Sequence, residues 1–244
     1  MSRMPPTPAL HGDRPGRFLV IVAHPDDADF GPAATAARWI DEGSVGELVC
    51  CTSGDAGADD ADTDPLELAR VREEEQRAAA SVVGYRDVHF LHQPDGALDN
   101  DLPLREQLVR IIREVRPDAV LTPDPTTLFT RDGHVQHTDH RAAGLAAVDA
   151  VYPAARNAMA FPHLAKGGLE PHVVRWLYLF WTNQPDAWVD VSGYVDRKMA
   201  ALRCHVSQIR DPEGFEQHVR ERIAAAGTEA GVEAADPFRV IELQ

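Results

Sequence analysis

Few cysteines and no long apolar run set the first limits on this chain. Its 244 residues include only three cysteines, Cys50, Cys51 and Cys204, which cannot make a disulfide framework and indicate reduced, buried thiols. No stretch approaches the length of a membrane span. Residues 1–16 also lack the apolar core of a signal peptide. We therefore expect a cytoplasmic protein.

Basic residues are also scarce. Lys and Arg number 24 against 39 Asp and Glu, so the formal net charge is −15. Because phosphate binding depends on Lys and Arg, this balance disfavours nucleic acids and anionic membrane surfaces as partners. Hydrophobic content of 44% and charged content of 26% are typical of a globular protein. The length suits a flexible N-terminal segment, residues 1–16, followed by one domain, residues 17–244.

Strand-like and helix-like segments alternate along most of the chain. This alternation predicts βαβ units, and hence an α/β, Rossmann-like fold with a mostly parallel sheet and helices on both faces. Residues 153–171 read as a long loop that walls a pocket or meets a partner subunit. The predicted strands are 17–23, 46–52, 87–91, 118–122, 173–182, 188–191 and 238–243, and the predicted helices are 28–42, 65–83, 101–116, 138–151, 194–208 and 215–226.

The first predicted strand ends in a histidine followed by two carboxylates, His24-Pro25-Asp26-Asp27. These residues would lie at the carboxyl end of the strand, where open α/β sheets bind their ligands. Imidazole and carboxylate are zinc ligands, so the turn is a plausible half of a metal site. The plainer alternative is that the Asp residues cap a helix, but a cap needs one Asp and does not explain His24.

A second polar segment, residues 133–141, lies between another predicted strand and a helix. Its His137 and His140 are three residues apart, which places both on one face of a helical turn. If the two loops converge, His24, Asp27 and His140 supply two imidazoles and one carboxylate for a metal. Asp26 and His137 then remain as acid and base groups.

These motifs resemble those of the LmbE-like (PIG-L) zinc-dependent N-acetylglucosaminyl deacetylases. The match is to the family's Ala-His-Pro-Asp-Asp segment, here 23–27, and its His-Pro-Asp-His segment, here 137–140 with Thr138 in place of Pro. The resemblance covers roughly residues 17–210. Weaker family-like pieces in the expected order are Thr52 to Asp55, Arg72 to Glu75, Pro94 to Gly96, and His205 to Gln208.

The resemblance implies a role for each matching residue. It implies zinc on His24, Asp27 and His140, Asp26 as general base, and His137 as the group that faces the developing oxyanion or protonates the leaving amine. It further implies substrate contacts by Arg72, steadied by Glu75, and by Asp95 and His205. Asp139 lies between His137 and His140 and is expected to orient one of these two rings. From the residues alone, Arg72 could equally be an exposed helix charge and Asp95 a turn residue before Gly96.

The predicted function is a metal-dependent hydrolase. It would remove the N-acetyl group from an N-acetylglucosamine-type amino sugar or glycoconjugate, by attack of a zinc-bound water that an Asp base activates. A two-His, one-carboxylate site also accepts Fe²⁺. The alternative is a non-catalytic metal- or sugar-binding module with the same fold. Retention of Asp26 and His137 favours the enzyme, because neither is needed to hold zinc.

Two further expectations concern partners and the acidic loop. The predicted partner is a small-molecule amino sugar, and a homo-oligomer is compatible with the sequence. A nucleotide-binding Rossmann protein would need a Gly-rich turn where this chain has Asp26 and Asp27. The acid-rich segment 55–64 lacks the spacing of a calcium loop, so we expect a solvated loop near the mouth of the pocket.

Overall fold

The computed structural model describes residues 9–12, 14–131 and 133–244, and the centre of its fold is strand β2 (Arg17–Val22). Every residue of β2 after Arg17 is buried. The strand pairs in parallel with β3 (Val45–Thr52) on one side and with β5 (Ala119–Pro123) on the other. A strand covered on both faces needs a continuous apolar run, and Phe-Leu-Val-Ile-Val provides it.

Eight strands form one sheet in the described part of the chain, in the order β1-β7-β8-β6-β5-β2-β3-β4. Neighbours pair in parallel except β8, which is antiparallel to both β6 and β7. The predicted mostly parallel sheet is thereby confirmed. The remaining strands are β1 (Ala9–Leu10), β4 (Val88–Gln93), β6 (Trp176–Phe180), β7 (Ala187–Asp190) and β8 (Ala235–Glu242).

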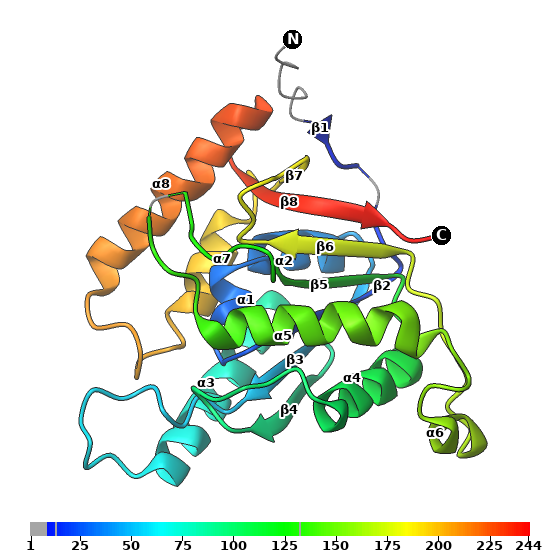
Figure 1. Ribbon diagram of the computed structural model, residues 1–244. Coiled ribbons are helices and arrows are strands. Elements are labelled where there is room, and N and C mark those ends of the chain that lie inside the picture. The colour runs from blue at the N-terminus through cyan, green and yellow to red at the C-terminus, as the bar shows by residue number, and fades with distance from the viewer. Residues whose placement is uncertain (1–8, 13, 132) are drawn as a thin grey trace.

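Helices cover both faces of the sheet, so each face has its own core (Figure 1). Phe18 and Val20 of β2 pack with α2, α3, α7 and α8, whereas Leu19 and Ile21 pack with α4 and α5. Alternate residues of one buried strand therefore serve the two cores. The helices are α1 (Asp27–Phe30), α2 (Ala33–Asp41), α3 (Pro65–Val83), α4 (Leu102–Val115), α5 (Thr138–Asp149), a π-helical turn η1 (Ala150–Ala155), α6 (Pro162–Lys166), α7 (Val195–Leu202) and α8 (Pro212–Ala230).

Several predicted boundaries differ from the structure. The predicted helix 28–42 is two helices, α1 and α2, because the chain turns at Gly31-Pro32 and a Cβ at Gly31 would overlap the ring of Phe180. The predicted loop 153–171 contains the end of η1 and all of α6. A run of Pro and Gly hid this short helix, which Pro162 begins at a position where proline is favoured.

Two residues of the N-terminal segment that was expected to be flexible pair with the sheet. Residues 1–8 and 13 lie outside the described residues, but Ala9–Leu10 form β1 and pair with Ala187 and Trp188 of β7. We propose that residues 17–244 form one domain, because strands from both halves of the chain alternate in a continuous sheet. None of the helices in the described ranges combines the length and the apolar character that a membrane-spanning segment requires.

One glycine sets how closely α5 approaches the sheet. A Cβ at Gly144 would overlap the carbonyl oxygen of Pro123 at the end of β5. Helix propensity alone favours alanine by about 1 kcal/mol. We expect Gly144→Ala instead to destabilise the protein by about 1–3 kcal/mol, because the backbone oxygen cannot move aside cheaply. Chemical denaturation measures this, with Gly193→Ala as the control, since a Cβ there meets nothing within 4 Å. Equal stability of both variants would show that α5 shifts without cost.

Candidate active site

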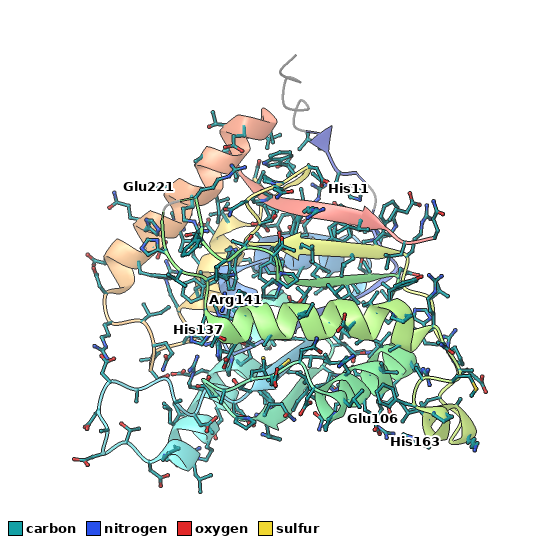
Figure 2. The ribbon with its side chains drawn as sticks, viewed as in Figure 1. His11, Glu106, His137, Arg141, His163 and Glu221 are labelled. Carbon is teal, nitrogen blue, oxygen red and sulfur yellow. The ribbon has the colours of Figure 1, made fainter. Side chains whose placement is uncertain are left out.

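The two polar loops meet at the carboxyl ends of the parallel strands. β2 ends just before His24, and α5 begins just after His137, which is its N-cap (Figure 2). The ring centroids of His24, His137 and His140 are 4.9, 5.2 and 5.1 Å apart. The structure therefore brings the residues of both motifs into one cluster, although His24 and His137 are 113 positions apart along the chain.

Asp27 links the two loops. Its Oδ1 lies 3.0 Å from His140 Nε2, and its Oδ2 lies 3.5 Å from His24 Nδ1. Oδ2 also accepts hydrogen bonds from the backbone N–H groups of Ala23 (3.1 Å) and His24 (2.9 Å). These contacts orient a carboxylate whose side chain is only 4% exposed.

The donor atoms suit a divalent metal. One ring nitrogen from each of His24, His137 and His140 lies within 4.8 Å of the others, and the Asp27 carboxylate contacts two of these rings. Imidazole nitrogen and carboxylate oxygen are ligands of both zinc and iron. The three histidines and Asp27 therefore suit the predicted metal. They are four candidate ligands, one more than the three protein ligands that the sequence predicted.

The charge balance of the cluster favours a cation. Burial lowers the pKa of His24, but Asp27 and Asp95 outweigh it and raise the pKa to about 11. Burial raises the pKa of Asp27, yet His140 and His24 hold it well below its usual value. Carboxylates that stabilise a proton on the His24 ring this strongly also stabilise a metal ion bound to that ring.

Asp26 differs from Asp27 in both backbone and environment. Its φ of 92° lies in the left-handed region, and its side chain makes no capping hydrogen bond to α1. This excludes the simple helix cap that the sequence left open. Its Oδ2 lies 3.2 Å from Arg72 Nη2. Burial and the neighbouring Asp27 raise the pKa of Asp26 to about 7, against the opposite effect of Arg72.

Arg72 reaches the site from α3. It is 4% exposed, and it donates hydrogen bonds to the carbonyl oxygens of Gly54 (2.9 Å) and Pro25 (2.8 Å) as well as to Asp26. The expectation that Glu75 steadies Arg72 is wrong, because the Glu75 carboxylate accepts hydrogen bonds from the N–H and hydroxyl of Ser207, each at 2.7 Å. Arg72 is therefore not an ordinary exposed helix charge.

The carboxylates of Asp95 and Asp139 lie beside Nε2 of His24, whereas Asp27 lies beside Nδ1. Asp95 Oδ1 lies 3.0 Å from His24 Nε2, while Asp95 Oδ2 accepts a hydrogen bond from the N–H of Ala56 at 2.8 Å. Asp139 is fully buried, accepts a hydrogen bond from the N–H of Gly96 at 2.7 Å, and lies 3.4 Å from the same His24 nitrogen. The side chain of Asp139 thus contacts His24, which is distant in sequence. The sequence had suggested a contact with the neighbouring His137 or His140.

His137 is the most accessible member of the cluster. Its Nδ1 accepts a hydrogen bond from the N–H of Asp139 at 3.2 Å, which makes the histidine itself the N-cap of α5. Burial and the neighbouring His24 and His140 lower the pKa of His137 below its usual value. These effects favour the neutral ring, and one of its nitrogens is already engaged with the backbone.

The cluster forms the floor of a pocket of about 450 Å³. Three lining residues escaped the sequence analysis, namely Phe30, Trp181 and Arg222. Trp181 follows β6 with a φ of 54°, and its ring lies 4.8 Å from that of His140. Its position at a strand end was a usable signal, whereas nothing in the sequence of α8 marked Arg222.

The loops around this pocket are partly those expected. Ala56 and Gly57 line it, which agrees with the prediction that the acidic loop lies near the mouth. Among its described lining residues none comes from 153–171, so the predicted role of that segment as a pocket wall is wrong. Figure 2 shows the reason, because His163 of α6 is well separated from His137 in that view.

His205 lies behind the pocket and does not line it. It is 1% exposed, and its Nε2 lies 2.9 Å from Asp29 Oδ2. The predicted helix 194–208 ends earlier, since α7 stops at Leu202. This geometry argues against the expected direct contact between His205 and a substrate.

Comparison with known proteins agrees with the fold and the motifs. The family described as PIG-L, GlcNAc-PI de-N-acetylase, matches residues 19–151. The diacetylchitobiose deacetylase of Thermococcus kodakarensis is 31% identical, over 92% of this chain and 83% of that protein. The 1D-myo-inositol 2-acetamido-2-deoxy-alpha-D-glucopyranoside deacetylase of Kineococcus radiotolerans is 29% identical, over 81% of this chain and 70% of that protein.

A solved structure matches over nearly the whole fold. The N,N'-diacetylchitobiose deacetylase of Pyrococcus horikoshii has a TM-score of 0.86 and 28% identity, with coverage of 93% of this chain and 84% of that chain. The family match spans both polar loops, the helices between them and the strands that carry them. This chain therefore belongs to the PIG-L family of de-N-acetylases.

Proposed function

We propose that this protein is a metal-dependent hydrolase that removes the N-acetyl group from an N-acetylglucosamine-type sugar. The observation that carries the proposal is the division of two consecutive carboxylates. Asp27 contacts the histidine cluster, while Asp26 faces Arg72 in the same pocket. The deacetylase activities named for relatives from Thermococcus, Kineococcus and Pyrococcus support the same substrate class.

We further propose that His24, Asp27 and His140 hold the metal. Their nitrogen and oxygen donors suit zinc, with Fe²⁺ as the alternative. A metal bound there supplies a Lewis acid that polarises the amide carbonyl and makes water a stronger acid. The contacts of Asp95 and Asp139 with His24 would orient this ligand, as metal-binding histidines generally require.

Asp26 is the proposed general base. It would take a proton from the attacking water as the bond from oxygen to the acetyl carbon forms. The carbon–nitrogen bond then breaks, and the amine leaves with that proton, so the products are acetate and the free amino sugar. A pKa raised to about 7 suits a group that both accepts and returns a proton near neutral pH.

His137 is the proposed partner of the developing charge. Its ring lies beside those of His24 and His140 and is accessible from the pocket. A hydrogen bond from its free nitrogen to the acetyl oxygen would strengthen as negative charge develops there. We assign the ring this one task, because Asp26 returns the proton to the leaving amine and the neutral ring has no second proton to give.

Binding of the sugar is proposed to involve the remaining lining residues. Arg72 lines the pocket, and its guanidinium lies 3.2 Å from the Asp26 carboxylate. Asp95 has an oxygen near His24 and lines the same wall. Trp181 offers an aromatic face, on which the apolar side of a sugar ring can stack.

Removal and return of the metal test the proposed function. We expect the purified protein to release acetate from N-acetylglucosamine or N,N'-diacetylchitobiose, to lose this activity on chelation, and to regain it with zinc. His140→Ala should lose both the metal and the activity. His163→Ala is the control, because this exposed histidine pairs with Glu106 and does not line the pocket. A tightly bound metal without acetate release from either substrate would contradict the proposed function.

Substitution of the proposed base should separate chemistry from metal binding. Asp26→Asn removes the proton acceptor while keeping the shape of the side chain, so we expect kcat to fall about 10²–10⁴-fold. Metal content should stay unchanged, since Asp27 and the histidines remain. Asp99→Asn changes an exposed acid outside the pocket and serves as the matched control. Full activity of Asp26→Asn would exclude this residue as the base.

The aromatic wall generates a prediction about substrate binding. Trp181→Ala should raise KM about tenfold, the effect of about 1.4 kcal/mol, because the stacking surface is lost. Trp181→Phe keeps an aromatic face and should restore most of the affinity. Steady-state kinetics measure both variants. If alanine and phenylalanine behave alike, Trp181 supports His140 by packing and does not contact the sugar.

A further inference from the structure

A chain of buried polar side chains lies directly behind Asp26. His205 Nε2 lies 2.9 Å from Asp29 Oδ2, and the same oxygen accepts a hydrogen bond from Gln76 Nε2 at 2.8 Å. Gln76 Oε1 in turn accepts the backbone N–H of Asp26 at 2.7 Å. Gln76 and Asp29 are fully buried, and none of the three side chains beyond Asp26 lines the pocket.

The chain ends at a strained backbone position. Asp26 has φ 92° and ψ −31°, a conformation that residues with a Cβ rarely adopt. Such strain persists only where surrounding contacts over-determine the conformation. The hydrogen bond from the Asp26 N–H to Gln76 is one such contact, and the side chain of Arg72 holds the preceding carbonyl, that of Pro25.

The strained turn has a consequence for the two carboxylates. It directs the side chain of Asp26 toward Arg72, while Asp27, one residue later, faces His24 and His140. In an extended or helical backbone at position 26 these side chains would take other directions. The contacts that hold the backbone of Asp26 in this conformation therefore keep the carboxylates of Asp26 and Asp27 directed at different partners.

The orientation of the Gln76 amide depends on Asp29. A carboxylate only accepts hydrogen bonds, so Asp29 selects the NH₂ end of Gln76 and leaves the carbonyl end for Asp26. A flipped amide would present a donor to the Asp26 N–H and an acceptor to Asp29. The contact of His205 with Asp29 fixes the carboxylate from the opposite side.

We propose that Gln76, held by Asp29 and His205, is a positioning residue for Asp26. It keeps the backbone of Asp26 in the left-handed conformation, so that the carboxylate faces the reacting water and not the metal. This inference rests on the proposed function, in which Asp26 is the general base. In this proposal His205 orients Asp29 from behind the pocket and does not contact the substrate.

Replacement of Gln76 tests the proposal kinetically. Gln76→Met keeps the length of the side chain and removes both hydrogen bonds, so we expect kcat to fall about tenfold or more with KM within about twofold. Metal content should not change. Gln107→Met is the matched control, a half-buried glutamine on α4 outside the pocket. Loss of metal and a raised KM together with the fall in kcat would indicate a general structural role and overturn the proposal.

A conservative pair of variants tests the link through Asp29. Asp29→Asn retains an oxygen that can accept from Gln76, whereas Asp29→Leu does not. We expect the kcat of Asp29→Asn to lie closer to that of the unmodified protein than the kcat of Asp29→Leu does. Equal kcat values for the two variants at equal thermal stability would overturn the role of Asp29 in orienting Gln76.

Amide hydrogen exchange provides a readout that does not require activity. In Gln76→Met the Asp26 N–H loses its partner, so its exchange should accelerate about tenfold or more, while amides of β2 stay protected. Unchanged exchange at Asp26 overturns the proposal, whether or not the protein releases acetate. If the unmodified protein releases no acetate but Asp26 exchange accelerates, the positioning by Gln76 stands and the proposed function fails.

Discussion

The buried carboxylate of Asp27 is the contact on which the arrangement of this site depends. It joins the end of β2 to the first turn of α5, because it contacts His24 from one loop and His140 from the other. A buried charge without partners is costly, and here two imidazoles and two backbone N–H groups compensate it. The same excess of negative charge that demands these partners makes the cluster attractive to a metal ion.

The site separates two neighbouring carboxylates by backbone geometry. In sequence Asp26 and Asp27 are equivalent acids, but a left-handed turn at Asp26 sends their side chains to different partners. Their pKa values accordingly move in opposite directions, up for Asp26 and down for Asp27. A single backbone conformation thus produces one group suited to accept a proton and one suited to bind a cation.

The outer pocket is assembled from segments that are remote in sequence. Trp181 follows β6, Arg222 belongs to α8, and Ala56 lies in the acidic loop after β3. Loops carried by a fixed scaffold commonly supply binding residues, so the outer pocket is the natural place for substrate selection. The floor, by contrast, depends on strand ends whose positions the sheet fixes.

The sequence by itself determined the sheet, the helices on both faces and the residues of the two polar loops. Apolar runs of strand length indicate strands that are buried on both faces. His and Asp residues directly after such runs indicate a site at the carboxyl ends of the strands. Only the tertiary structure decided that Asp139 contacts His24, that Glu75 binds Ser207 and not Arg72, and that His205 lies behind the pocket. Local patterns specify which face of an element is buried. Which distant side chain a buried polar group meets depends on how helices pack across the sheet, and no local pattern carries that information.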